Sequence, residues 1–122
     1  MSEIASQSEI DMNVLAVLDS RLGRASMVGL IAAHLKHATA LCERLAAMAV
    51  ALDRKELQAI GHQIVGSCGS IGLTGLSQLG CLLEDESAEA HPERLQQLIT
   101  ATLESCRAAC TVLADRYPEV GA

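Results

Sequence analysis

The sequence of 122 residues contains no tryptophan and no phenylalanine, and Tyr117 is its only aromatic residue, although half of the chain is hydrophobic. Aromatic and β-branched side chains dominate β-sheets, so a core of Leu, Ala, Ile, Val and Met favours helices packed on helices. A chain of this length forms one domain with a single core. No uninterrupted apolar run approaches the ~18 residues of a membrane span, so we expect no direct membrane contact.

Basic residues are also scarce, because nine Lys and Arg against fifteen Asp and Glu give a formal charge of −6 at pH 7. A protein that binds nucleic acid neutralises phosphates with a basic face, and this sequence shows none. We therefore expect no nucleic-acid partner. The sequence also lacks a Gly-rich nucleotide loop and a kinase motif, so we do not expect it to bind or hydrolyse ATP.

The cysteines are odd in number, show no CxxC spacing and follow no recognisable signal peptide; they are Cys42, Cys68, Cys81, Cys106 and Cys110. Most fall on apolar helical positions, which predicts reduced, buried thiols in a cytoplasmic protein. Cys106 and Cys110 lie one helical turn apart and could bind a metal, but no Cys or His pair elsewhere is evidently placed to complete a tetrahedral site. Core packing is the preferred interpretation, and we predict no metal site.

Apolar periodicity predicts an all-α protein, with a flexible N-terminus over residues 1–10 and a helical domain over residues 11–118. The expected segments are a short helix at 12–18, a turn at 20–25, long helices at 26–51, 53–70, 75–87 and 92–117, and a tail at 119–122. Asp53 and Glu56 form a capping box, Thr74 caps the next helix, and Pro92 opens the last one. Short links predict an up-down antiparallel four-helix bundle with a short additional N-terminal helix.

The most informative segment is 61–72, which places one histidine among glycines within an amphipathic helix. Each glycine costs a helix interior up to ~1 kcal/mol relative to alanine, so a partner surface that approaches the imidazole closely would explain them. On a helical wheel the apolar residues lie opposite His62, at about 160° to 240° from it; they are Leu57, Ile60, Ile64, Cys68 and Ile71. His62 is therefore predicted to face solvent, and Gly61 to face inward. The candidate partner-binding residues around His62 are Gln58, Ala59, Val65, Gly66 and Gly69.

Two runs in this region resemble the histidine-containing phosphotransfer (HPt) domain: His62-Gln-Ile-Val-Gly66-Ser67-Cys68 with Ile71-Gly72, and Leu76-x-x-Leu79-x-x-x-Leu83-Glu84. The family also tends to have an aspartate nine residues before the histidine, as Asp53 is here, and the resemblance covers residues 11–117. It implies that His62 is a phosphoacceptor and that receiver domains of response regulators or hybrid sensor kinases are the partners. It also implies that Mg²⁺ and a lysine come from the partner receiver, with no cofactor bound by this chain. Where the family has a basic residue three positions after the histidine, this sequence has Val65.

Two functions are compatible with these residues. The first is a phosphocarrier, in which His62 carries a phosphoryl group between receiver aspartates in a multistep two-component relay. The second is an HPt-like module that docks a receiver or another regulator through the same helix face without being phosphorylated. The sequence shows no second catalytic carboxylate near His62, and the resemblance implies that the chain supplies only nucleophile and docking surface. We expect a cytoplasmic monomer that is not an enzyme.

The remaining histidines and acidic residues are interpreted structurally. His34 falls within an apolar stripe and is predicted to be buried or half-buried. His34 and His37 could share a metal, but no completing carboxylate or cysteine is evident. His91 precedes a proline at a helix start, and the acidic stretch 84–89 is predicted to be a solvated helix end and loop.

Overall fold

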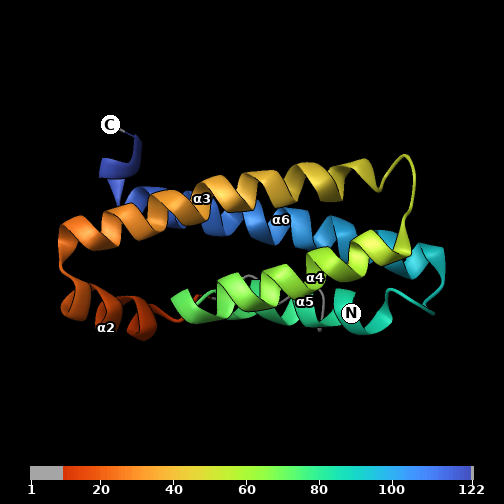
Figure 1. Ribbon diagram of the computed structural model, residues 1–122, viewed down its shortest axis with the longest axis horizontal. Helices are drawn as coiled ribbons and strands as arrows, with labels where there is room; N and C mark the ends of the chain where they lie inside the picture. Colours follow the sequence, from red (N-terminus) through yellow and green to blue (C-terminus); the bar gives the residue numbers. More distant parts are fainter. Residues whose placement is uncertain (1–9, 122) are drawn as a thin grey trace.

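The computed structural model describes residues 10–121, which form five α-helices and two short 3-10 helices, with no strand among them (Figure 1). The helices are α2 (Met12–Leu22), α3 (Arg24–Ala47), α4 (Arg54–Cys68), η1 (Gly69–Ile71), α5 (Thr74–Glu86), α6 (Pro92–Arg116) and η2 (Pro118–Gly121). The prediction of an all-α protein is confirmed. The predicted flexible N-terminus up to residue 9, and residue 122, lie outside the described residues.

The two longest helices, α3 and α6, lie side by side, and α4 and α5 form a second pair beneath them in Figure 1. Helix α5 also packs on α6, α3 packs on α4, and α2 packs against α3 and η1 at one end. The core between these elements is mostly leucine and isoleucine, and the predicted apolar stripe of α4 is entirely buried within it. The helical period therefore determined correctly which face of α4 points inward.

The predicted boundaries of the first two helices are wrong by several residues. Helix α2 continues to Leu22 and α3 begins at Arg24, so the expected turn of six residues is reduced to Gly23. Gly23 adopts φ 82° and ψ 159°, a conformation that side chains with a Cβ rarely adopt. Because Gly23 alone makes the turn between α2 and α3, a turn of six residues is not required. Helix α3 ends at Ala47 instead of residue 51.

The predicted capping box is half formed. The Asp53 carboxylate accepts a hydrogen bond from the backbone N–H of Glu56 at 3.1 Å, as expected of an N-cap. The Glu56 carboxylate does not accept a hydrogen bond from the backbone N–H of Asp53, because it accepts two from Arg44 of α3, at 2.8 and 2.9 Å. A guanidinium with two donors forms stronger hydrogen bonds with a carboxylate than a backbone N–H does, so the partner from α3 is preferred.

The starts of the last two α-helices differ from one another. Helix α5 begins at Thr74, and its N-cap position is occupied by Leu73, which makes no side-chain cap, so the prediction that Thr74 is the cap is wrong. Leu73 is 1% exposed, and burial of its side chain fixes the entry into α5 in place of a polar cap. Pro92 opens α6 as predicted, and the His91 imidazole accepts from the Glu93 N–H at 3.2 Å.

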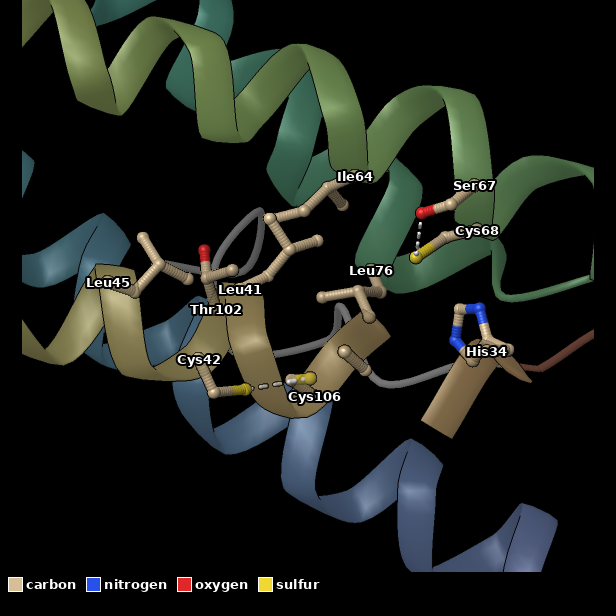
Figure 2. A pocket seen from close by; sticks show the side chains of 11 residues that line it. His34, Leu41, Cys42, Leu45, Ile64, Ser67, Cys68, Leu76, Thr102 and Cys106 are labelled. Carbon is tan, nitrogen blue, oxygen red and sulfur yellow. Dashed lines mark hydrogen bonds between the residues drawn. The ribbon is translucent and has the colours of Figure 1, made fainter. Parts of the chain in front are cut away.

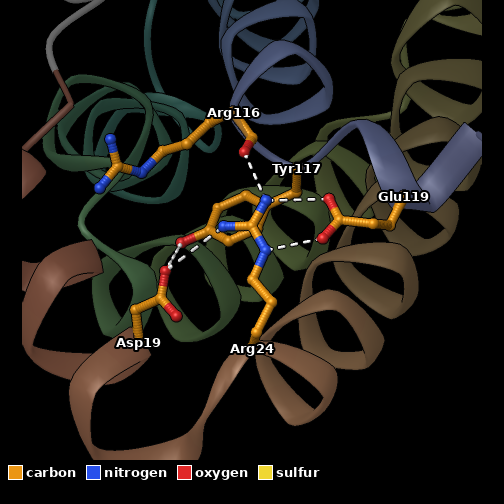
Figure 3. A network of polar contacts seen from close by, with 5 residues as sticks. All are labelled: Asp19, Arg24, Arg116, Tyr117 and Glu119. Atoms are coloured by element: carbon orange, nitrogen blue, oxygen red, sulfur yellow. Dashed lines mark hydrogen bonds and ion pairs between the residues drawn. The ribbon is translucent and has the colours of Figure 1, made fainter.

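A polar network ties the C-terminal end of the described chain to the start of α3 (Figure 3). Arg24 donates two hydrogen bonds to the Glu119 carboxylate, at 2.7 and 2.9 Å, and one to the carbonyl of Arg116. Its guanidinium lies 4.6 Å from the centre of the Tyr117 ring, and the Tyr117 hydroxyl donates to Asp19 at 3.1 Å. The hydrogen bonds from Arg24 lower the pKa of Glu119 to about 2. Residues 119–121, predicted as part of a tail, thus belong to the 3-10 helix η2 (Pro118–Gly121).

Candidate functional site

The site is built around His62 in the middle of α4, on the face opposite the buried stripe. Its side chain is 77% exposed, as the wheel predicts. The candidate residues around it lie on the same outward face: Gln58, Ala59, Gly66 and Gly69 are exposed and Val65 is half-buried. A Cβ on Gly66 would meet nothing within 4 Å, and one on Gly69 only the Ser77 hydroxyl at 3.5 Å. The surface beside the imidazole is therefore poor in side chains and open to a partner.

A carboxylate from the neighbouring helix contacts the imidazole. His62 Nδ1 lies 2.7 Å from Oε2 of Glu84, on α5. A carboxylate thus contacts His62, where the sequence indicated no second catalytic carboxylate, and the interpretation of residues 84–89 as a solvated helix end does not describe Glu84. Its side chain is only 32% exposed and is directed toward the histidine.

Two glycines explain how Glu84 reaches His62. A Cβ on Gly61 would lie 2.7 Å from the carbonyl oxygen of Gly80 and 2.8 Å from the backbone nitrogen of Glu84. A Cβ on Gly80 would lie 2.8 Å from Cγ2 of Ile64. Side chains at either position would hold α4 and α5 apart, so both glycines are needed for this close approach. Since Gly61 adjoins His62 and Glu84 follows Gly80 by one turn, the same approach brings carboxylate and imidazole together.

The signal for Glu84 was present in the sequence but incomplete. Glu84 ends the second run of the HPt resemblance, directly after Leu83, and the inward position of Gly61 predicts close packing of α4 on another helix. Neither observation says which residue of that helix lies beside the histidine. A helix packed against Gly61 through its own small residue, Gly80, would have pointed to the acid one turn later.

Helix α3 fixes the rotation of α4 from the other side. Arg44 binds Glu56 with two donors and also donates to the Gln63 side chain at 3.1 Å. The hydrogen bonds from Arg44 to the Glu56 carboxylate lower the pKa of Glu56. Gln63 adjoins His62, so Arg44 holds α4 by two points about two turns apart, and this keeps the imidazole facing outward.

The pairing with Glu84 determines what the imidazole can do. A carboxylate only accepts hydrogen bonds, so in neutral imidazole the Nδ1–H donates to Glu84 and the lone pair lies on Nε2. Because the ring is exposed, Nε2 faces solvent. The arrangement is that of an oriented nitrogen nucleophile able to attack an electrophile carried by another molecule.

The other candidate metal ligands do not form a site. Within residues 10–121 no group of three or more His, Cys, Asp or Glu side chains is placed to hold a metal ion. His34 is 8% exposed, and burial, with a smaller contribution from the charge of His37, lowers its pKa. His34 is thus the buried histidine that the apolar stripe predicts.

The prediction of buried thiols holds only in part. Cys68 and Cys106 are buried, Cys42 and Cys110 are half-buried, and Cys81 is exposed, contrary to the prediction. Cys81 follows the inward Gly80 on α5 and so falls on the outer face of that helix. None of the helices in the described part of the chain is both long enough and apolar enough to span a membrane.

The fold and site define a helical module with an exposed histidine whose ring is oriented by a carboxylate. A family model of the Hpt domain matches residues 30–109, which include all of α4 and α5. The chain belongs to the Hpt domain family. Membership suggests histidine phosphotransfer in two-component signalling, where Hpt domains act as phosphocarriers that interact with receiver domains. No curated protein and no solved structure matches the chain with significance.

Proposed function

We propose that this chain is a histidine phosphotransfer protein of a multistep two-component relay, built on an up-down four-helix bundle. In this proposal His62 accepts a phosphoryl group from the aspartate of one receiver domain and passes it to the aspartate of another. The observation that supports it most is the 2.7 Å contact between His62 Nδ1 and Glu84, because it leaves Nε2 as the free nucleophile on an exposed face.

The chemistry requires little from this chain. The Nε2 lone pair attacks the phosphorus of an aspartyl phosphate, the N–P bond forms as the P–O bond to the aspartate breaks, and the aspartate leaves as a carboxylate. The imidazole gains positive charge in this step, and the Glu84 carboxylate, hydrogen-bonded through Nδ1–H, offsets it. Transfer to the second aspartate reverses these bond changes. Mg²⁺ and a lysine of the receiver are expected to neutralise the phosphoryl oxygens, so we propose no cofactor for this chain.

The same geometry supports the proposed partner-binding face. Four exposed residues surround the histidine: Gln58, Ala59, Gly66 and Gly69. The two glycines have no side chain that would keep a receiver away from the imidazole. A receiver aspartate lies within its own domain, so close approach of the two surfaces is a condition for transfer. Val65 is half-buried and stands where the family has a basic residue, so it adds apolar area to this face.

Val65 also favours a second candidate, a docking module of the same fold that binds a receiver without being phosphorylated. A basic residue one helical turn from the imidazole would attract the phosphoryl group, and valine cannot do so. The two candidates share a surface and differ only in whether His62 reacts.

The test is transfer of radioactive phosphate from purified phosphorylated receiver domains to this chain. His62→Gln should abolish the label while leaving the free energy of unfolding within about 0.5 kcal/mol of wild type, since the position is exposed. His37→Gln is the matched control, because His37 is also exposed on a helix and should be dispensable. The label should be acid-labile and alkali-stable, as a phosphoramidate is.

The outcomes separate the candidates. Label that persists in His62→Gln would refute His62 as the acceptor. Receiver binding without any label, in the wild type and in His62→Gln alike, would support the docking module and contradict the carrier.

A further inference from the structure

Two cysteines from different helices lie in contact, and neither belongs to the helices that carry His62 and Glu84. Sγ of Cys42 in α3 lies 3.0 Å from Sγ of Cys106 in α6, although the residues are 64 apart in sequence (Figure 2). A third thiol, Cys110, lies one turn further along α6. The proposed phosphotransfer uses none of these groups.

We propose that Cys42 and Cys106 form a reversible disulfide that joins α3 to α6 when the protein meets a hydroperoxide. The sulfur atoms must approach from 3.0 Å to the ~2.05 Å of a disulfide, a movement of about 1 Å. Both side chains line a small cavity between α3, α4, α5 and α6, together with His34, Cys68 and Thr102. We expect the open space beside the two sulfurs to give the side chains room for this movement.

The same geometry disfavours the alternative pair within α6. Cys106 and Cys110 are four residues apart on one helix, where Cβ atoms are separated by about 5–6 Å. A disulfide requires Cβ atoms about 3.5–4.5 Å apart, so bonding these two would distort the backbone of α6. Cys42 approaches from another helix and carries no such restriction.

Cys42 is the thiol suited to react first. It is half-buried, whereas Cys106 is 5% exposed. The hydrogen bond with Cys106 lowers the pKa of Cys42 below its ordinary value, and the nearby charge of Arg107 lowers it further. Hydrogen bonds with Cys110 and Cys42, together with burial, raise the pKa of Cys106, so Cys106 stays protonated until the second step. Cys110, whose pKa is lowered by its own hydrogen bond with Cys106, is the competitor for the first step.

The two steps balance with hydrogen peroxide as oxidant. The Cys42 thiolate attacks one peroxide oxygen, the O–O bond breaks, and the products are a Cys42 sulfenic acid and hydroxide. The Cys106 sulfur, losing its proton, then attacks the Cys42 sulfur, and the sulfenic oxygen leaves as water. Each cysteine is oxidised by one electron and the peroxide is reduced by two. A dithiol reductant restores both thiols by exchange.

Peptide mapping of the full chain tests this pairing directly. Cleavage after Lys and Arg separates the three thiols, with Cys42 in residues 37–44, Cys106 in 95–107 and Cys110 in 108–116. The experiment uses Cys81→Ser protein, which lacks the exposed thiol, treated with hydrogen peroxide and then alkylated. We expect peptide 37–44 linked to 95–107, two thiols protected from alkylation, and full reversal by dithiothreitol. Since the link closes a long loop, the melting temperature should rise by on the order of 10 °C.

Matched variants sharpen the result. Cys106→Ser should lose the link and the rise in melting temperature, and Cys110→Ser should keep both. A link from 37–44 to 108–116, stable sulfinic acid at Cys42, or disulfides only between molecules would each overturn the proposal. The peptide map of the Cys81→Ser protein decides the pairing even if a further serine variant folds poorly. Phosphate uptake at His62 should be unchanged by the link, because α4 and α5 are not joined by it.

Discussion

The contact between Gly61 and α5 gives the sharpest test of how the site is held together. In Gly61→Ala, the new Cβ would lie 2.7 Å from the Gly80 carbonyl oxygen and 2.8 Å from the Glu84 nitrogen. Both atoms belong to the backbone, so no side chain can rotate away. The first distance is about 0.7 Å short of the 3.4 Å at which ordinary contact begins, so α4 and α5 must separate.

The magnitude follows from two opposing terms. Overpacking of this kind typically costs about 1–3 kcal/mol, and alanine in place of glycine in a helix contributes up to ~1 kcal/mol. We therefore expect Gly61→Ala to lower the free energy of unfolding by about 1–2 kcal/mol. Gly66→Ala, in the same helix with nothing within 4 Å of the new Cβ, should raise it by up to ~1 kcal/mol.

Urea denaturation followed by circular dichroism measures both variants against wild type. Opposite signs for the two substitutions are the expected result. A Gly61→Ala protein as stable as Gly66→Ala would show that α4 and α5 do not approach as closely as described, and the account of how Glu84 reaches His62 would then fail.

Three further predictions concern single side chains. Glu84→Ala should shift neutral His62 toward the Nε2–H tautomer in ¹⁵N NMR spectra and slow its phosphorylation by about tenfold. Glu84→Gln keeps an acceptor oxygen and should preserve the tautomer. An unchanged tautomer in Glu84→Ala would contradict the role of Glu84 in orienting the imidazole. Val65→Lys should raise the phosphorylation rate by roughly one to two orders of magnitude, and this increase should be smaller at high salt. If both the rate and the receiver affinity were unchanged, position 65 would affect neither phosphoryl transfer nor receiver binding. Burial lowers the pKa of His34, so the unfolded state binds more protons than the folded state as pH falls through 6.5. The free energy of unfolding should therefore decrease in this range and level off below the pKa of His34 in the folded state. In His34→Gln, urea titrations between about pH 7.5 and 5 should show a weaker decrease, and an equal one would assign the effect to other groups.

The sequence determined the features that depend on local periodicity. The apolar residues of α4 repeat with the helical period, so the burial of its stripe and the exposure of His62 could both be predicted without knowledge of a neighbouring helix. The inward position of Gly61 and the start of α6 at Pro92 followed in the same way, because each depends on residues within a turn or two.

Only the tertiary structure decided the contacts between helices. Glu84 reaches His62 across 22 residues because Gly61 and Gly80 let two backbones approach, and no periodicity encodes which turn of α5 lies beside which turn of α4. Glu56 does not complete the predicted capping box for the same reason, because its carboxylate accepts hydrogen bonds from Arg44 on another helix. Side-chain direction along one helix is a local property of the chain, whereas the pairing of side chains across helices depends on how close the axes lie and on their register, which the packing of the whole core sets.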